Sequence, residues 1–274
     1  MIRRVAKNLG LYDGDAPAPS VQLERDGFTV VSDVLSVELQ DRLRAEIASV
    51  FAHHPPERNR TDADEFRYEM LNRSAAAQEA IAHPRILGVI EPLLGDDCHV
   101  IANTAWRNPP TFPGGPWHCD AGPHVPRAEG VEWDDRIPYP IFAIGAHLLL
   151  ADCDVADGPT AVVPGSHRSG RLPPYGQIGP TGDVTYDGRP PALLTGRAGD
   201  VALFVSDCWH RGTAAGPDGR GRLFLQVHYG RRDLAQRLRT TDAVNHLSDD
   251  AIGRATTERE RSIIGLHPAY FYDG

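Results

Sequence analysis

Apolar residues in the first third of the chain recur with the spacing of α-helices. A helix is predicted over residues 37–51, with Ser36 as its N-cap. Its apolar stripe consists of Leu39, Leu43, Ile47 and Val50. A second helical region covers residues 74–94, and Pro84 inside it is expected to start a new helix because proline fits the first turn. The polar stretch between the two regions, residues 53–65, predicts a loop.

The period changes after residue 95, where apolar and polar residues begin to alternate. Five segments there predict strands: residues 99–106, 139–151, 159–163, 201–206 and 222–229. A short apolar run at residues 27–31 predicts one more strand ahead of the first helix. Loops rich in Gly and Pro separate the strands, notably 121–138 and 169–191. Helices followed by strands predict an α+β chain whose second part is an antiparallel barrel or sandwich.

The length of 274 residues fits one large domain or two small ones. Residues 1–20 are interpreted as an N-terminal arm and residues 21–274 as a single domain. This domain is expected to have three parts: a helical part at about 36–95, a β-barrel core at about 96–230 and a C-terminal extension at 231–274. Residues 234–247 of the extension are predicted to be helical. The extension ends with three aromatic residues that are expected to pack onto the body: Tyr270, Phe271 and Tyr272.

The chain is acidic, with 28 Lys and Arg against 37 Asp and Glu and a formal net charge of −9. This charge argues against binding to nucleic acid or to an anionic membrane, since both require a basic surface. Residues 141–151, the longest apolar stretch, have about half the ~20 residues of a membrane helix. Residues 1–10 lack the apolar core of a secretory signal. The four cysteines show no zinc-ribbon spacing, so a cytoplasmic protein with reduced thiols is expected.

Two short motifs carry candidate metal ligands. His118 and Asp120 are two residues apart, so in an extended segment their side chains point to the same face. His210 follows directly after the predicted strand at 201–206. Two histidines and one carboxylate occupy one face of an octahedral ion and leave three positions open, which is typical of non-haem Fe(II) centres. A structural zinc site would instead require four protein ligands, usually including thiolates.

A third motif is an arginine in an otherwise apolar strand. Four alternating residues share its face: Arg222, Phe224, Gln226 and His228. If this face is buried, the Arg222 guanidinium requires an anion, and its planar fork suits a carboxylate. That carboxylate belongs either to a ligand or to an Asp or Glu of the protein.

Taken together, these motifs resemble the phytanoyl-CoA dioxygenase family of Fe(II)/2-oxoglutarate-dependent oxygenases. The resemblance spans about residues 24–230, with the matching segments in order. These segments are Asp26-Gly27-Phe28, His83-Pro84, Leu93-Leu94-Gly95, residues 116–120, residues 157–160, residues 164–168, Gly199-Asp200, Trp209-His210 and residues 222–229. The resemblance implies a double-stranded β-helix core, that is, a jelly roll of the cupin type, with flanking N-terminal helices.

The resemblance also implies roles for individual residues. Fe(II) would be bound by His118, Asp120 and His210. The distal carboxylate of 2-oxoglutarate would be bound by Arg222, helped by the hydroxyl residues Thr213 and Thr160. Arg220 competes with Arg222 for this role, but it follows a Pro-Asp-Gly turn, whereas Arg222 alternates correctly with the strand.

The activity implied is oxidation of a C–H bond with O2 and 2-oxoglutarate as cosubstrates and succinate and CO2 as coproducts. Halogenating relatives replace the carboxylate ligand with a small residue, so Asp120 favours hydroxylation; desaturation, epoxidation and ring formation are alternatives. Two other functions stay open: a cupin-like hydrolase or isomerase that does not use 2-oxoglutarate, and a non-catalytic barrel that binds a small molecule. The first shares the three metal ligands but does not require Arg222 and Thr213, and the second has no need of three convergent ligands.

The only partner expected is a small-molecule substrate, for which secondary metabolism is the proposed context, and the pattern favours no particular oligomeric state. Substrate contacts are predicted from the loop after Asp120, from the helical part and from the Arg222 strand. They are Trp133, Arg136, Phe66, Tyr68 and His228. A fatty acyl-CoA is not favoured, because the chain has no basic cluster for its phosphates.

Overall fold

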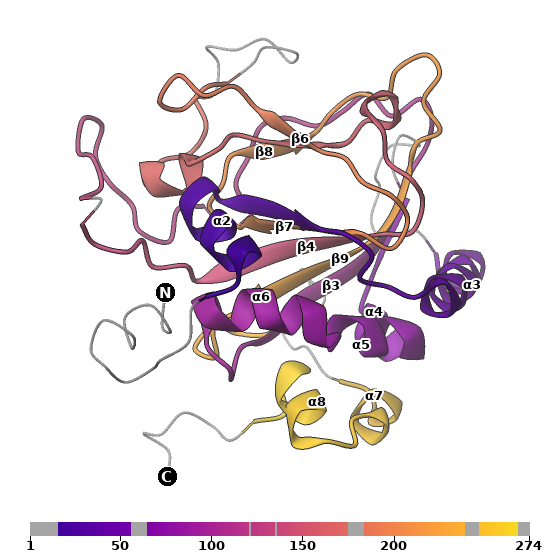
Figure 1. Cartoon of the computed structure of the whole chain (residues 1–274). Helices are drawn as coiled ribbons and strands as arrows, with labels where there is room; N and C mark the ends of the chain where they lie inside the picture. The colour runs from indigo at the N-terminus through magenta and orange to yellow at the C-terminus, as the bar shows by residue number, and fades with distance from the viewer. Residues whose placement is uncertain are drawn as a thin grey trace.

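The computed structural model describes residues 16–55, 65–120, 122–134, 136–174, 184–238 and 247–267, and two antiparallel sheets form its centre (Figure 1). The larger sheet contains, in spatial order, β1 (Phe28–Val31), β7 (Val201–Val205), β4 (Ala143–Leu149), β9 (Arg222–Gly230), β3 (His99–Asn108) and β2 (Glu65–Tyr68). The smaller sheet contains β6 (Ala192–Leu194), β5 (Thr160–Val162) and β8 (His210–Gly212). The expected α+β class with a jelly-roll core is confirmed.

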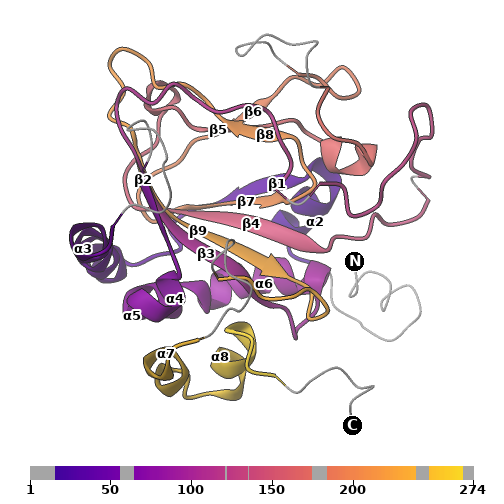
Figure 2. The ribbon, with the colours of Figure 1, turned by 180° about the vertical axis from the view of Figure 1, so that it is seen from behind.

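Helices cover the outer face of the larger sheet. They are α2 (Ala18–Asp26), α3 (Val37–His53), α4 (Met70–Arg73), α5 (Ala75–Ile81), α6 (Pro84–Leu94), α7 (Asp249–Arg254) and α8 (Glu258–Ile263). Helices α4 to α6 lie against the sheet, and α7 and α8 lie outside them (Figures 1 and 2). The buried Tyr229 hydroxyl of β9 donates to the Ile81 carbonyl at 2.9 Å, which joins the sheet to α5.

The predicted helices have the expected local causes. The Ser36 hydroxyl accepts a hydrogen bond from the Leu39 backbone at 3.2 Å and caps α3, whose predicted apolar stripe is buried. Pro84 opens α6 as its first residue, as predicted, and Gly95 ends it.

The inner face of the larger sheet faces the smaller sheet. Opposite residues of an antiparallel pair share a face, so one inner row contains Phe66, Trp106, Phe224 and Leu149, and the next contains Tyr68, Thr104, Gln226 and His147. In the smaller sheet Val162 pairs with His210, and Thr160 lies on the same face two residues away. The two faces meet where Thr160 contacts His147, at 3.4 Å between Oγ1 and Nδ1.

Three elements differ from the prediction. Helix α2 was not predicted; it includes Ala18–Ser20 of the expected arm, while residues 1–15 lie outside the described part. Strand β2 occupies a position assigned to the loop and the helical part, because its pairing with β3 is non-local and leaves no periodic signal in four residues. The prediction of a helix at 234–247 is wrong for residues 234–238, which are irregular. Residues 239–246 and the aromatic end at 270–272 lie outside the described part.

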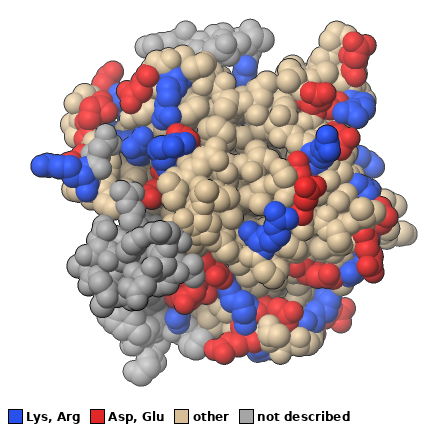
Figure 3. All heavy atoms as spheres, viewed as in Figure 1, with Lys and Arg blue, Asp and Glu red and all other residues tan. Residues whose placement is uncertain are grey.

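The surface carries charges of both signs. On the face seen in Figure 3, Arg side chains are interspersed with Asp and Glu around a large uncharged area. None of the helices in the described ranges is both long enough and apolar enough to cross a lipid bilayer.

Candidate metal centre

The structure brings His118, Asp120 and His210 together between the two sheets. One ligand atom from each lies within 4.8 Å of the other two. Asp120 Oδ1 is 3.4 Å from His210 Nε2 and 3.8 Å from His118 Nε2. Ligand atoms at about 2.1 Å from one ion and at right angles lie about 3 Å apart. The three atoms are therefore close to the spacing that a single octahedral ion requires.

Backbone carbonyls orient both imidazoles. His118 Nδ1 donates to the Pro116 carbonyl and His210 Nδ1 to the Cys208 carbonyl, each at 2.9 Å. Because Nδ1 carries the proton, Nε2 carries the lone pair in both rings, as metal ligation requires. Burial alone would raise the pKa of Asp120, but the charges and hydrogen bonds of His210 and His228 outweigh it and hold the pKa well below its usual range. In the tautomer that the two carbonyls select, the centre therefore offers one carboxylate and the Nε2 atoms of two imidazoles.

A short bridge between chain segments fixes the register of these ligands. The backbone N–H groups of His118 and His210 each donate to the other residue's carbonyl at 2.9 Å. Cys119 points to the opposite face, where its thiol lies 3.4 Å from the Asp207 carbonyl. This is the alternation that the sequence predicted for residues 118–120.

The segment ahead of His210 is anchored by the turn at residues 164–168. The Ser166 hydroxyl accepts from the Trp209 backbone N–H at 2.8 Å, and the Val163 N–H donates to the Trp209 carbonyl at 2.9 Å. The peptide units directly before His210 are thereby held on the smaller sheet.

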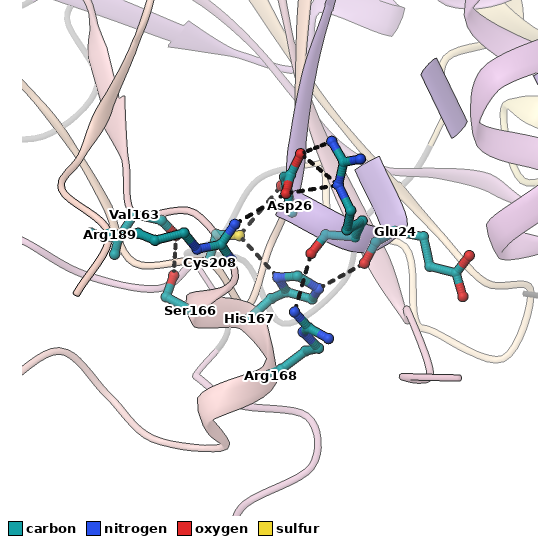
Figure 4. Close-up of polar contacts among 10 residues, drawn as sticks. Glu24, Asp26, Val163, Ser166, His167, Arg168, Arg189 and Cys208 are labelled. Carbon is teal, nitrogen blue, oxygen red and sulfur yellow. Dashed lines mark hydrogen bonds and ion pairs between the residues drawn. The ribbon is translucent and has the colours of Figure 1, made fainter. Parts of the chain in front are cut away.

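Figure 4 shows the buried side of this turn. His167 Nε2 donates to the Glu24 carbonyl at 3.1 Å, and His167 Nδ1 lies 3.7 Å from Cys208 Sγ. Burial lowers the pKa of His167 to about 4 and raises the pKa of Cys208. The pair is therefore a neutral imidazole and a protonated thiol that pack in the interior behind the turn.

Arg222 is a buried cation that has no acidic partner among the described residues. Its Nη1 donates to Thr160 Oγ1 at 2.9 Å, its Nε has no hydrogen-bond partner, and the residue is 8% exposed. The rings of Phe112 and Phe224 lie 5.7 and 5.1 Å from its guanidinium carbon. Burial lowers the pKa of Arg222 to about 10, so it stays charged at neutral pH. A buried guanidinium of this kind is suited to a carboxylate ligand.

The two threonines named with Arg222 have different environments. Thr160 contacts Arg222 directly, and its hydroxyl also lies 3.4 Å from His147 Nδ1. Thr213 instead donates its hydroxyl to the Pro159 carbonyl at 2.7 Å. His147 is buried, and burial together with the charge of Arg222 lowers its pKa well below the usual range. His147 was not assigned from the sequence, although the alternation of its strand places it on the inner face.

Arg220 has a protein partner. Its side chain is 63% exposed and binds the buried Asp157 carboxylate, at 2.7 Å between Nη2 and Oδ2. The same carboxylate accepts the backbone N–H groups of Arg220 and Asp154 at 2.7 and 2.8 Å. These hydrogen bonds, led by the one from the Arg220 side chain, lower the pKa of Asp157 to about 2.

Asp157→Ala is expected to destabilise the fold by about 1–3 kcal/mol at pH 7, because two backbone donors lose their acceptor. An unfolded aspartate titrates near pH 4. The contribution of Asp157 is therefore complete above about pH 4 and is lost as the pH falls from 4 to 2. In urea unfolding, the difference in the free energy of unfolding between wild type and Asp157→Ala should be smaller at pH 3 than at pH 7. Arg220→Ala should lower the free energy of unfolding by less than Asp157→Ala does. A difference of equal size at both pH values would contradict this assignment.

The inner rows of the larger sheet lead directly to Asp120. Trp106 stacks on Phe66, with ring centroids 4.9 Å apart, and its Nε1 donates to Gln226 Oε1 at 2.7 Å. Gln226 Nε2 contacts His228 Nε2 at 3.3 Å, and His228 Nε2 lies 3.0 Å from Asp120 Oδ2. Phe66 and His228, both predicted substrate contacts, therefore lie on the face that carries the centre, as does Tyr68, whose ring meets Phe66 edge-on. Phe66 and Tyr68 are on a strand and not in the helical part.

The other two predicted substrate contacts do not touch the three ligands in the described part of the chain. Arg136 is bound to Asp134 at 2.6 Å, and its side chain is 89% exposed. Trp133 donates to the Ile137 carbonyl at 2.6 Å and lines a separate pocket of about 260 Å³ with Tyr139. Their role in substrate binding stays a prediction.

Comparison with known proteins gives one family and a consistent fold. The family model for phytanoyl-CoA dioxygenase (PhyH) matches residues 23–221. Ectoine dioxygenase of Nocardia farcinica (strain IFM 10152) is 29% identical in an alignment of 231 residues, and the match covers 74% of this chain and 74% of that protein.

Two solved structures illustrate the shared fold. The epimerase SnoN, in complex with Fe3+, alpha ketoglutarate and nogalamycin RO, is 23% identical with a TM-score of 0.62, over 82% of this chain and 86% of that chain. EctD from S. alaskensis, with 2-oxoglutarate and 5-hydroxyectoine, is 22% identical with a TM-score of 0.57, over 83% and 81%. At these identities the structures support the two-sheet fold with flanking helices.

Proposed function

The chain belongs to the phytanoyl-CoA dioxygenase family of Fe(II)/2-oxoglutarate-dependent oxygenases, and on this premise we propose that it hydroxylates a C–H bond of a small organic molecule. Fe(II) is bound by His118, Asp120 and His210 in this proposal. The support is the convergence of their three ligand atoms and the proton on Nδ1 of both imidazoles. When bound, Fe(II) and 2-oxoglutarate supply the activation of O2. One oxygen atom then enters the substrate as hydroxyl and the other enters succinate, with loss of CO2.

The single observation that carries the choice of cosubstrate is the Arg222 side chain. It is buried and charged, and no carboxylate of the described residues pairs with it. Such a cation is costly unless an anion binds it. The distal carboxylate of 2-oxoglutarate is that anion in our proposal, with Thr160 as the neighbouring hydroxyl. A cupin-like hydrolase or isomerase, or a non-catalytic barrel, would not by itself supply an anion for the buried Arg222.

Thr213 is not proposed to bind the carboxylate directly, because its hydroxyl already donates to the Pro159 carbonyl. His147 and Thr160 together complete the environment of Arg222. The neutral His147 adds no second positive charge, and its Nδ1 accepts from Thr160, so the Thr160 oxygen remains oriented toward Arg222.

The substrate is proposed to bind over the inner face beside Asp120. Partly exposed side chains of this face include a phenol, an indole, an amide and an imidazole, those of Tyr68, Trp106, Gln226 and His228. Such a surface favours a small molecule with an apolar ring or chain and at least one hydrogen-bonding group. Relatives named for ectoine and for nogalamycin biosynthesis make these two compounds the first to test.

An anaerobic titration tests the proposed cosubstrate. A 2-oxo acid chelated to Fe(II) gives a visible charge-transfer absorption that neither component gives alone. The wild-type protein with Fe(II) should develop this band as 2-oxoglutarate is added. Succinate, which lacks the 2-oxo group, is the matched control and should give none. Failure of the band to appear with saturating Fe(II) and 2-oxoglutarate would refute the proposal.

A further inference from the structure

His228 touches the one oxygen of the proposed carboxylate ligand that faces away from the two histidines. Asp120 Oδ1 is directed at His118 and His210, whereas Oδ2 lies 3.0 Å from His228 Nε2. We infer that His228 is a positioning residue, which holds Asp120 so that Oδ1 alone is presented to the metal. This inference rests on the proposed function, because it assigns Asp120 as a metal ligand.

Hydrogen-bond chemistry determines the direction of this contact. An ionised carboxylate only accepts hydrogen bonds, so the His228 Nε2 atom that contacts Oδ2 must carry a proton. With that proton in place, Nε2 has no lone pair for a metal ion. His228 is therefore a donor to the ligand and not a fourth ligand, although it lies close to the other imidazoles.

The His228 ring packs against the neighbouring strand. On the neighbouring strand, Gly145 pairs with His228, and a Cβ at position 145 would be only 3.2 Å from His228 Cδ2. The ring lies over this glycine with its side chain 18% exposed. A donor fixed in this way keeps Asp120 in one orientation without loss of side-chain entropy on metal binding.

The consequence concerns the number of open metal positions. Two imidazoles and one carboxylate oxygen leave three of six positions open, which suffice for a bidentate 2-oxo acid and O2. If Asp120 rotated and bound through both oxygens, one of these three positions would be lost. A hydrogen bond to Oδ2 opposes that rotation, so His228 keeps the third metal position open for the cosubstrates.

Two variants of His228 separate this role from a packing role. His228→Phe keeps a ring but removes the donor, whereas His228→Gln keeps an N–H donor on a shorter, unringed side chain. Anaerobic titration with Co(II) should show His228→Phe binding the metal about 10–100-fold more weakly, while His228→Gln stays within about threefold of wild type. His53→Phe, at the exposed C-terminal end of α3, is the control for loss of an imidazole as such.

The result that would overturn the inference is equal Co(II) affinity of His228→Phe and wild type, or equal weakening in the Phe and Gln variants. If wild type itself bound Co(II) no more tightly than Asp120→Ala, the proposed function would fail. This outcome differs from the two that overturn only the role of His228.

A measurement on the wild type removes any dependence on the folding of variants. In the Zn(II)-loaded protein, long-range 1H–15N NMR of the imidazoles should show the His228 proton on Nε2 and the protons of His118 and His210 on Nδ1. An unprotonated or metal-bound Nε2 on His228 would contradict the inference.

Discussion

Replacing His118, Asp120 or His210 with alanine is expected to abolish conversion of 2-oxoglutarate to succinate. Loss of a neighbour that merely orients a ligand typically costs about 10–100-fold, so loss of a ligand itself should exceed about 100-fold. The fold should survive, because the register of the bridge is set by backbone hydrogen bonds between residues 118 and 210. Far-UV circular dichroism and succinate quantification on the same samples provide the measurement.

Cys119→Ser is the matched control for these variants. Residue 119 lies between two of the proposed ligands, but its side chain points to the opposite face and a serine hydroxyl can still reach the Asp207 carbonyl. The control should retain turnover. Near-normal succinate formation in two of the three alanine variants would show that the triad is assigned wrongly.

The second large effect is expected at Arg222. Removing one partner of a buried, hydrogen-bonded charge pair costs about 2–5 kcal/mol, which is roughly 30-fold to several-thousandfold in Kd. Arg222→Ala should weaken 2-oxoglutarate binding by such a factor. The affinity of Arg222→Lys for 2-oxoglutarate should lie between those of wild type and Arg222→Ala. Lysine keeps the positive charge but lacks the planar guanidinium that binds a carboxylate through two hydrogen bonds.

Arg220→Ala is the control, since its guanidinium is exposed and already bound to Asp157. Isothermal titration of the metal-loaded protein with 2-oxoglutarate should show Arg220→Ala close to wild type. The reverse order, with Arg220→Ala the weaker binder, would move the cosubstrate site to the Asp157 turn.

The sequence identified those features of the centre that depend on local alternation. His118 and Asp120 are two residues apart, so any extended conformation turns them to one face, and Arg222 and His228 follow the same rule on β9. The signals that predict α3 are also local, since its N-cap and its apolar stripe lie within one segment. Such features need no knowledge of the rest of the chain.

Contacts between distant segments were not accessible in this way. The spacing along the chain did not reveal that Thr160 contacts Arg222 while Thr213 is used by a carbonyl. Strand β2 was missed for the same reason, because its hydrogen bonds come from β3 and no periodic pattern marks it. The loop at residues 121–138 shows no periodicity, so only the side-chain chemistry of Trp133 and Arg136 indicates a substrate contact there.

The most direct test of the central claim is turnover under 18O2. Wild-type protein with Fe(II) and 2-oxoglutarate, supplied in turn with ectoine and nogalamycin, is allowed to react, and the succinate is analysed by mass spectrometry. The proposed reaction predicts succinate that carries one 18O atom, in amounts that depend on Asp120 and Arg222. Succinate without the label, or labelled succinate in amounts that do not change when Asp120 or Arg222 is replaced, would contradict the assignment of this chain as a working 2-oxoglutarate-dependent oxygenase.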